Sequence, residues 1–295
     1  SALDAVGEAR KRCWRYNWVI DLDIKGFFDN LNHDLLRLAL QKHAPEKWVM
    51  LYIERWLKAP MQQPDGRLVE REKGTPQGGV ISPLLANLYL HYAMDEWLRR
   101  NFPQNPFERY ADDSVVHCRT EQEANELLHA LKTRLLHCGL ELHPVKTKIV
   151  YCKDDDRRGN FHTTKFDFLG YTFCRRRSKN RYGKHFVNFT PAVSNSAKQS
   201  MRQEMRRWKV HLRSDKSLVD ISHMFNPKLR GWFIYYGKYY KSELYGVFRH
   251  FNRTLSRWAM RKYKKLKGHN RRAEYRMGAN RKRIPSSILS LANWP

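Results

Sequence analysis

The sequence predicts an α+β fold, in which an antiparallel sheet packed on helices is followed by an all-helical region. First, residues 17–190 mix short segments of period-two alternation with helical segments, without the regular order of βαβ units. Second, beyond residue 190 the hydrophobic residues recur only at helical spacing. Third, 41% of the 295 residues are hydrophobic and 13% are aromatic, too many for a basic disordered tail. The chain therefore folds, and its length suits one large or two ordinary domains.

The first predicted elements follow the order of the chain. Residues 17–24 alternate near their end as a strand does. Asn32 is a suitable N-cap for a helix through residue 43, and Pro45 suits the first position of a helix over 46–58. Residues 63–66, Gln-Pro-Asp-Gly, are a hairpin turn signal.

The middle of the chain continues this mixture. Residues 74–79 are too glycine-rich for regular structure, and Ser82-Pro83 opens a helix to about residue 100. Strands over 107–110 and 114–118 flank Ala111-Asp112-Asp113, so these three residues form a hairpin tip. A capping box at Thr120 begins a helix that ends at Cys138-Gly139. The remaining strands are predicted at 147–151 and 166–173, before a second hairpin that turns near 180–183 and a domain boundary at Thr190-Pro191.

The region after this boundary is predicted to be helical. Hydrophobic residues first follow helical spacing through Met201 and Leu218, and a long segment then runs from Pro227 to about Lys267. Residues 271–283 are basic with little periodicity. We therefore expect four regions: residues 1–16, 17–190, 191–268 and 269–295.

Charge and cysteine content limit the function. The chain has 56 Lys and Arg against 29 Asp and Glu, a net charge of +27. This balance argues against a purely neutral-ligand enzyme and predicts a polyanionic partner, most commonly nucleic acid. Five cysteines without a C-x-x-C pair argue against a disulfide scaffold and a zinc-dependent nuclease appendage, and favour a reduced cytosolic setting. The uncharged residues 74–94 contain prolines and glycines and are predicted to be core, not a membrane span.

Three carboxylates carry the predicted chemistry. Asp23 lies at a strand end, and Asp112 and Asp113 lie at a hairpin tip. Adjacent carboxylates at a tight turn repel each other and favour a cation, and a third one suits two Mg²⁺ ions about 3.5–4 Å apart. An isolated Asp-Asp pair would more commonly be a solvated turn. Because Asp112-Asp113 occurs together with the motifs described next, we prefer a metal site to a solvated turn.

Five motifs in order resemble the reverse transcriptases, and specifically the bacterial group II intron-encoded proteins. The segments 23–29, 74–82, 110–113, 139–148 and 168–171 are similar to palm motifs A to E of that family. Residues 194–268, with Arg230-Gly231-Trp232, resemble the thumb, or maturase domain X. The resemblance implies a reverse-transcriptase palm followed by an all-α thumb, and an RNA-directed DNA polymerase with an RNA-binding maturase role in splicing.

The resemblance also implies residue roles at the active site. Asp23, Asp112 and Asp113 would be catalytic: Asp23 and Asp112 would bind both Mg²⁺ ions, for which Mn²⁺ could substitute, and Asp113 would complete the set of metal-binding carboxylates. The carbonyl of Ile24 would be a further ligand. The residues expected at the incoming nucleotide are the steric gate Phe28, together with Gln77, Ala111 and Lys146. The alternatives are a core aromatic for Phe28, a generic loop residue for Gln77 and a surface lysine for Lys146.

Primer and RNA contacts are implied at two further places. The primer would contact Tyr110 and the primer-grip residues Leu169, Gly170 and Tyr171, which could otherwise be a plain buried strand. On the thumb, aromatic residues from Trp232 to Tyr239 would partly be core, and the interleaved basic residues would face solvent or phosphates. These basic residues are Lys228, Arg230, Lys238 and Lys241.

The implied partners are intron RNA, an RNA template with a DNA primer, and deoxynucleoside triphosphates, without a membrane, in the bacterial cytoplasm. Only residues 1–16 precede the predicted strand that leads into motif A, so we expect the N-terminal fingers to be largely missing and the isolated chain to polymerise poorly. A separate fingers segment is an open alternative. A non-catalytic RNA-binding maturase is the main rival function, and a reverse transcriptase of a defence or diversity-generating system is disfavoured by the maturase-like thumb.

Overall fold

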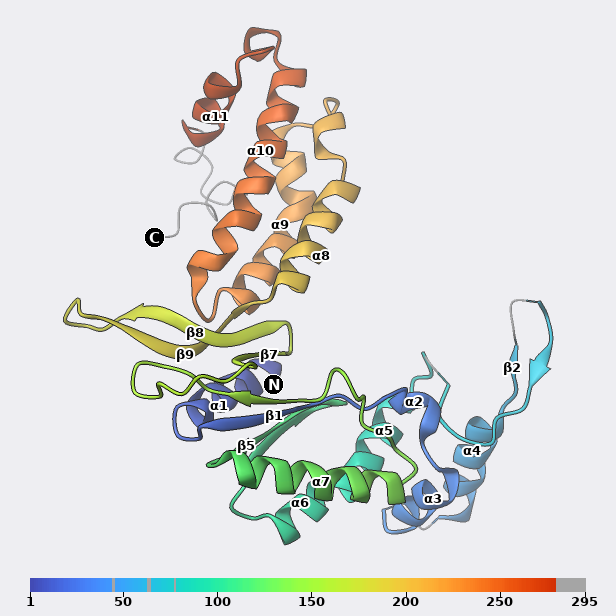
Figure 1. Ribbon diagram of the computed structural model, residues 1–295. Coiled ribbons are helices and arrows are strands. Elements are labelled where there is room, and N and C mark those ends of the chain that lie inside the picture. Colours follow the sequence, from blue (N-terminus) through green and yellow to red (C-terminus); the bar gives the residue numbers. More distant parts are fainter. Residues whose placement is uncertain (44–45, 63–64, 77, 280–295) are drawn as a thin grey trace. The chain divides into compact units, whose positions relative to one another are not determined.

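The computed structural model describes residues 1–43, 46–62, 65–76 and 78–279 (Figure 1). The chain divides into two compact units, one of residues 1–169 and 174–189 and the other of residues 170–173 and 190–295. The first unit mixes helices with antiparallel strands and the second is largely helical, which confirms the predicted fold class. In these ranges, none of the helices combines the length and the apolar character that a membrane span requires.

The element bounds are as follows. The helices are α1 Ala2–Cys13, α2 Phe27–Asn30, α3 His33–Gln41, α4 Lys47–Lys58, α5 Ser82–Leu90, the π-helical turn η1 His91–Asp95, α6 Glu96–Asn101, α7 Glu121–His137, α8 Asn195–Arg207, η2 Val210–Leu212, α9 Leu218–Tyr236, η3 Lys241–Leu244, α10 Tyr245–Lys262, η4 Lys264–Leu266 and α11 Asn270–Ala279. The strands are β1 Trp18–Leu22, β2 Met61–Gln62, β3 Leu68–Val69, β4 Phe107–Tyr110, β5 Asp113–Cys118, β6 Lys148–Tyr151, β7 Lys165–Phe168, β8 Tyr171–Lys179 and β9 His185–Val193.

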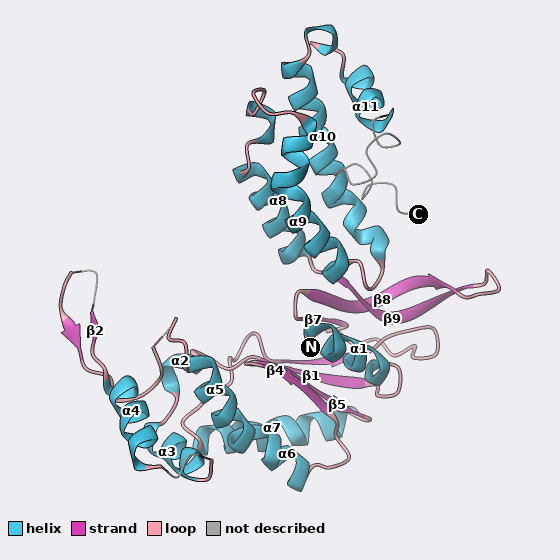
Figure 2. Ribbon diagram, turned by 180° about the vertical axis from the view of Figure 1, so that it is seen from behind, coloured by secondary structure: helices cyan, strands magenta, loops and turns pink. Residues whose placement is uncertain are grey.

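The central sheet of the first unit has the strand order β4-β5-β1-β6, with antiparallel neighbours. Alternate side chains of β1, among them Ile20, join a hydrophobic cluster that includes Leu131 of α7. The intervening Val19 is also fully buried, so both faces of β1 are covered. Figure 2 shows α7 and α1 on opposite sides of the sheet, with α6 near α7.

The helix predicted over residues 82–100 is interrupted by a π-helical turn between α5 and α6. The turn has a visible cause in α7, because the guanidinium of Arg134 donates hydrogen bonds to the carbonyls of Tyr92 and Ala93, at 3.1 and 3.0 Å. A π-turn leaves carbonyls without their usual helical partners, and a side-chain donor satisfies them. The periodic sequence gave no sign of this distant partner.

The expected strand over 166–173 is wrong as a single element. It is two strands, β7 and β8, joined by a turn at Leu169 and Gly170, whose φ angles are 51° and 76°. Positive φ at both central residues is typical of a tight type I′ hairpin turn. Asp113 is likewise not at a tip, because it is the first residue of β5 and pairs with Tyr110, so the turn itself contains only Ala111 and Asp112.

The second unit has its own hydrophobic cluster, formed mainly by α8, α9 and α10. Pro227 does not begin a segment but lies inside α9, where burial of Phe225 and Leu229 outweighs a helix penalty of about 3 kcal/mol. The long segment predicted to Lys267 is broken after α9. The basic stretch after residue 270 is helical as far as Ala279, because Ala273 and Met277 are buried four residues apart.

Candidate active site

The predicted carboxylates lie at one end of the central sheet. In the antiparallel register of β1 and β5, Leu22 is opposite Ser114, so Asp23 follows β1 where Asp113 begins β5. Burial raises the pKa of Asp113, and the Asp112 and Asp23 carboxylates raise it further, against the hydrogen bond that Asp113 accepts from the Leu169 amide at 3.2 Å. Both other carboxylates therefore lie close enough to act on the charge of Asp113.

Two further carboxylates, Asp21 and Asp167, contribute to the same charge cluster. The pKa of Asp21 is raised to about 7, mainly by burial and then by Asp113, while Lys148 lowers it. Sequence reasoning missed both residues. Asp21 could have been found, since it lies two residues before Asp23 on a period-two strand and so shares its face. Asp167 comes from β7, and no local pattern connects that strand to the site.

The backbone and the side chain of Asp23 are held by the segment before β6. Thr147 Oγ1 lies 3.2 Å from both the amide and the carbonyl of Asp23, and the His143 amide donates to the same carbonyl at 2.8 Å. The Lys146 Nζ lies 3.4 Å from Asp23 Oδ2, and both side chains are partly exposed. Lys146 is therefore at the carboxylate cluster, where its ammonium partly offsets the charge of Asp23.

The donor chemistry of the cluster fits a hard cation. Magnesium prefers carboxylate oxygens, and the charges of Asp112 and Asp23 add to the burial that raises the pKa of Asp113. Within the described ranges, however, no three His, Cys, Asp or Glu side chains are grouped closely enough to hold a metal ion together. The predicted metal ligands are thus near one another without forming a closed coordination group.

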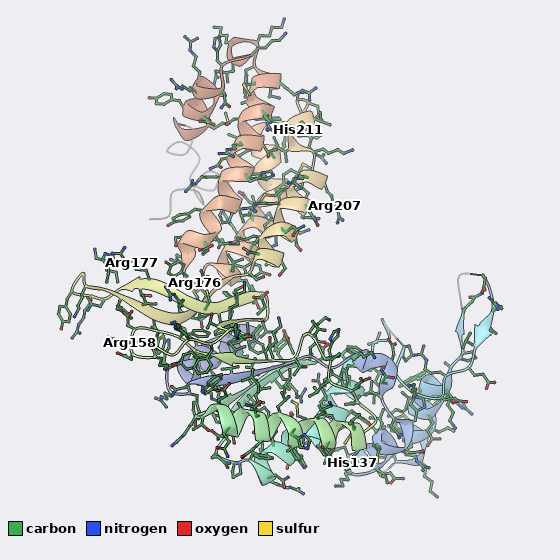
Figure 3. The ribbon with its side chains drawn as sticks, in the orientation of Figure 1. His137, Arg158, Arg176, Arg177, Arg207 and His211 are labelled. Atoms are coloured by element: carbon green, nitrogen blue, oxygen red, sulfur yellow. The ribbon has the colours of Figure 1, made fainter. Side chains whose placement is uncertain are left out.

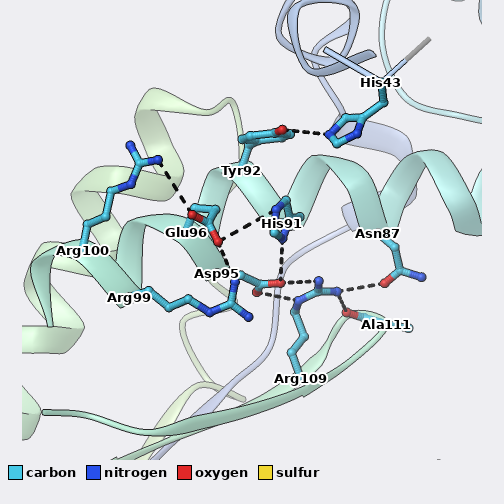
Figure 4. Close-up of polar contacts among 10 residues, drawn as sticks. All are labelled: His43, Asn87, His91, Tyr92, Asp95, Glu96, Arg99, Arg100, Arg109 and Ala111. Atoms are coloured by element: carbon cyan, nitrogen blue, oxygen red, sulfur yellow. Dashed lines mark hydrogen bonds and ion pairs between the residues drawn. The ribbon is translucent and has the colours of Figure 1, made fainter. Parts of the chain in front are cut away.

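Arg109, at the end of β4, fixes the turn that carries Asp112. Its guanidinium makes a two-pronged contact with Asp95, at 2.7 and 2.5 Å, and both side chains are almost fully buried (Figure 4). The same guanidinium donates to Asn87 Oδ1 at 2.8 Å and to the Ala111 carbonyl at 2.9 Å. Ala111 has φ 57°, which is costly for a residue with a Cβ. The clamp through Arg109 holds this turn, and sequence reasoning missed it because Asp95 is 14 residues away.

The glycine-rich loop is fastened to the helix that carries Phe28. The Thr75 amide donates to the Phe28 carbonyl at 2.7 Å, and the Gly74 amide donates to the Leu31 carbonyl at 2.7 Å. A Cβ at Gly74 would lie 2.7 Å from the Phe28 carbonyl oxygen, so only glycine permits this approach. Phe28 is half-buried against the core and its ring contacts Phe27 at 5.3 Å. Gln77 lies outside the described residues.

The predicted primer contacts differ in exposure. Tyr110 and Ala111 are exposed, Leu169 and Gly170 are half-exposed, and Tyr171 is fully buried. Tyr171 packs among Tyr235, Tyr236 and Tyr239, and its hydroxyl donates to the carbonyl of Tyr235. A Cβ at Gly170 would lie 3.0 Å from the Tyr236 hydroxyl oxygen. The side chain of Tyr171 can thus support a primer contact only by packing.

The basic residues predicted on the thumb are exposed, as expected. They are Lys228, Arg230, Lys238 and Lys241. Lys228 forms an ion pair with Glu204 at 2.5 Å, which lowers the pKa of that carboxyl. Both residues line a cavity of about 700 Å³ between α8 and α9, with Trp232 and Tyr236 on its wall. The predicted aromatic residues of this helix are half-buried, so each combines packing with an accessible edge.

Parts of the chain are similar to known protein families and to individual proteins. Residues 3–173 match the family described as reverse transcriptase (RNA-dependent DNA polymerase), and residues 198–276 match the group II intron, maturase-specific domain. Protein YkfC of Escherichia coli K12 is 28% identical over 242 residues, which are 71% of this chain and 59% of YkfC. Group II intron-encoded protein LtrA of Lactococcus lactis subsp. cremoris is 32% identical over 118 residues, 39% of this chain and 19% of LtrA.

The chain thus spans less than two thirds of the length of these relatives. Among solved structures, telomerase from Candida albicans in complex with a TWJ fragment of telomeric RNA aligns with a TM-score of 0.48 and 12% identity, over 100% of this chain and 52% of that one.

Proposed function

The chain belongs to the reverse transcriptase family and carries a group II intron maturase domain, and from this premise we propose that it extends a DNA primer on an RNA template. The single observation that carries this proposal is the position of Asp23, Asp112 and Asp113 at one end of the sheet, where the end of β1 lies opposite the start of β5. Bound Mg²⁺ would be held by these carboxylates and the Ile24 carbonyl, and would supply charge neutralisation and activation of the primer hydroxyl.

The residues of the chain have separate tasks in the proposed reaction. The primer 3′ hydroxyl loses its proton to water, its oxygen bonds to the α-phosphorus of the deoxynucleotide, and the bond from that phosphorus to the pyrophosphate oxygen breaks. Lys146, beside Asp23, donates a proton to the leaving pyrophosphate or offsets its charge. Phe28 occupies the volume that a ribonucleotide 2′-OH would need, on a helix held in place by the loop at Gly74. Gln77, in the same loop, would contact the incoming nucleotide.

The second unit is proposed to bind the RNA. Residues 190–295 contain 25 Lys and Arg against five Asp and Glu. Clustered cations release counterions when they bind phosphates, so they supply sequence-independent affinity. The cavity that contains Lys228 and Trp232 offers a cation and an aromatic surface together. This unit would recognise folded intron RNA by shape and backbone, in the manner expected of a maturase.

The test is primer extension on an RNA template by variants of the chain. Asp113→Asn should lower extension by several orders of magnitude and leave RNA affinity within about two-fold, because the carboxylate serves chemistry and not RNA binding. Asp167→Asn is the matched control, since it removes another carboxylate of the same cluster and should retain extension. Equal activity of Asp113→Asn and the parent chain would refute the polymerase site.

The rival function has a distinct outcome. If the chain binds intron RNA and promotes splicing but shows no extension with either Mg²⁺ or Mn²⁺, both alone and after addition of a separately made fingers segment, the chain acts as a non-catalytic maturase. The cytoplasmic location of the chain stays a prediction.

A further inference from the structure

The hairpin formed by β8 and β9 is strongly basic in a unit that is otherwise nearly balanced in charge. Residues 1–189 contain 31 Lys and Arg against 24 Asp and Glu, and six of these basic residues lie between 175 and 184. Without them, the region would be within one charge of neutrality. The stretch from 168 to 203 contains no Asp or Glu. The positive charge of this unit is therefore concentrated on one hairpin.

The strand pattern places these cations in a row. On β8, alternate side chains are buried at Tyr171 and Phe173, and the same alternation continues with exposed Arg175, Arg177 and Lys179. Residues two apart on a strand lie about 7 Å from each other on one face. One face of β8 is thus buried in the core at the start of the strand and presents a row of exposed cations toward its end.

The tip of the hairpin is fixed rather than loose. Asn180 Oδ1 accepts hydrogen bonds from the amides of Tyr182 and Lys184, both at 2.9 Å, and the Asn180 amide donates to the Lys184 carbonyl at 2.9 Å. Gly183 has φ 84°, which the turn requires. The Arg181 guanidinium lies 4.7 Å from the ring centre of Tyr182, and 78% of Tyr182 is exposed. The tip presents a fixed aromatic ring with cations beside it.

The outer strand of the hairpin is tied to the rest of its unit. Asp155 accepts from the Val187 amide at 2.6 Å, and the Trp14 indole donates to the Phe189 carbonyl at 2.8 Å. The loop that contains Asp155 is neutral overall, with three acidic and three basic residues between 153 and 158. Its Arg158 is exposed, and Figure 3 shows it on the loop below the hairpin, with Arg176 and Arg177 of β8 on the upper side. The loop therefore anchors the hairpin without cancelling its charge.

We propose that this hairpin is a second RNA-binding surface, in which the cation row contacts the phosphate backbone of a stem and Tyr182 stacks on an unpaired base. The inference rests on the proposed function, which supplies RNA as the polyanion. A merely solvated charged strand would not need a fixed tip with an exposed tyrosine. The deep, narrow major groove of an RNA helix excludes base reading by a ribbon, so backbone contact and stacking remain.

The first experiment measures RNA affinity against salt concentration for the full chain. The hairpin variant replaces the five exposed cations by Gln: Arg175, Arg177, Lys179, Arg181 and Lys184. The control variant replaces five exposed cations elsewhere in the same unit by Gln: Lys42, Lys58, Arg100, Arg119 and Lys132. With a stem-loop RNA as the probe, the hairpin variant should reduce the slope of log affinity against log salt by up to about 4, and the control should change it little. Equal slopes for the two variants would overturn the proposal.

The second experiment tests the tip and the identity of the nucleic acid. A photoreactive phenylalanine analogue at position 182 should crosslink to the unpaired loop of the RNA, and the same analogue at Leu136, exposed on α7, should not. Crosslinking that is equally efficient to a DNA stem-loop, or only to a protein, would overturn the commitment to RNA. Primer extension on a short primer-template should persist in the hairpin variant. Failure of the unaltered chain to extend would count against the polymerase proposal and would leave the salt and crosslinking results as independent measurements.

Discussion

At the scale of single residues, the carboxylate cluster has a pH-dependent cost for folding. The pKa of Asp21 is about 7 in the folded chain, mainly because the carboxyl is buried, whereas its ordinary value is 3.8. Between about pH 4 and pH 7 the folded chain keeps a proton that the unfolded chain releases. The free energy of unfolding contributed by this group therefore falls as pH rises through that window. Ionisation of Asp21, two residues before Asp23, therefore lowers the stability of the folded chain.

Asp21→Asn tests this linkage. The amide cannot ionise, so the variant should be more stable than the parent at pH 8, by roughly 1–3 kcal/mol after allowance for partial exposure. The difference should shrink as pH falls and be small near pH 4, because the carboxyl is then protonated in the folded chain and nearly half protonated in the unfolded chain. The melting temperature of the first unit, measured from pH 4 to pH 8, checks the prediction. If the difference in melting temperature between variant and parent were constant over this range, packing and not titration of Asp21 would be its cause.

Phe28 offers a second test at this scale. Because its ring is half-buried and its helix is held by the loop at Gly74, truncation should open space beside the nucleotide without unfolding the site. Phe28→Ala should increase the use of ribonucleotides relative to deoxynucleotides by about 10-fold or more, as a steric gate predicts. Competition between the two nucleotide types in primer extension is the measurement. Phe27→Leu, which alters the fully core neighbour, is the control, and equal selectivity in the two variants would make Phe28 a packing residue.

At the scale of elements, the sequence could predict what is encoded locally. The capping boxes of Ser217 and Thr120 and the cap at Asn32 are short patterns, and the helices after Asn32 and Thr120 were predicted in place. The breaks were missed, because each depends on a distant partner. Arg134 of α7 donates to the carbonyls of the π-turn, and the Asp113 carboxylate accepts from the amide of Leu169 in the turn between β7 and β8. For the site, the acidic residues were readable from motifs, whereas the Arg109 clamp was not.

Arg109 connects the π-helical turn to the hairpin of β4 and β5. Arg109→Lys keeps the charge but loses the planar fork that contacts Asp95 and Ala111 at once. The turn that carries Asp112 should then shift, which can lower the extension rate by up to about 10²-fold. RNA affinity should stay unchanged, because the side chains of the clamp are almost fully buried and do not face the RNA. Single-turnover extension and a filter-binding assay provide the two readouts.

The matched control for this clamp is Arg99→Lys, which alters an exposed arginine that pairs with Glu96 in the same helical region (Figure 4). Its extension rate should stay within about two-fold of the parent rate, since surface ion pairs contribute little. A loss of rate in Arg109→Lys that added Arg or guanidinium restores would support the positioning role. A large loss in both variants would instead indicate a general weakening of α6.

At the scale of the whole molecule, the two units differ in charge, and each unit has its own hydrophobic core. Residues 190–295 hold 25 of the 56 basic residues and few acidic ones, while the three carboxylates of the site belong to the first unit. If six to ten phosphates are neutralised, RNA affinity should fall about 10³- to 10⁵-fold between 50 and 200 mM salt. Chemistry and bulk RNA affinity are therefore expected to depend on different units.

Two buried leucines allow this division to be tested with the same substitution. Leu131 of α7 and Leu255 of α10 are both fully buried, and each belongs to the hydrophobic cluster of its own unit. Leu→Ala at such a site costs about 2–5 kcal/mol. Calorimetry should show two transitions, of which Leu131→Ala lowers one and Leu255→Ala the other, each by several degrees.

The functional readouts should separate in the same direction. On mild heating, Leu131→Ala should lose primer extension while salt-sensitive RNA binding persists, because the melted core carries the carboxylates. Leu255→Ala should lose RNA affinity first, because the melted core supports the cationic helices. A single transition that both variants lower equally would show that the chain unfolds as one cooperative unit. In that case the stability of the catalytic site and that of the RNA-binding helices would be one thermodynamic quantity, and any mutation that weakens one would weaken the other.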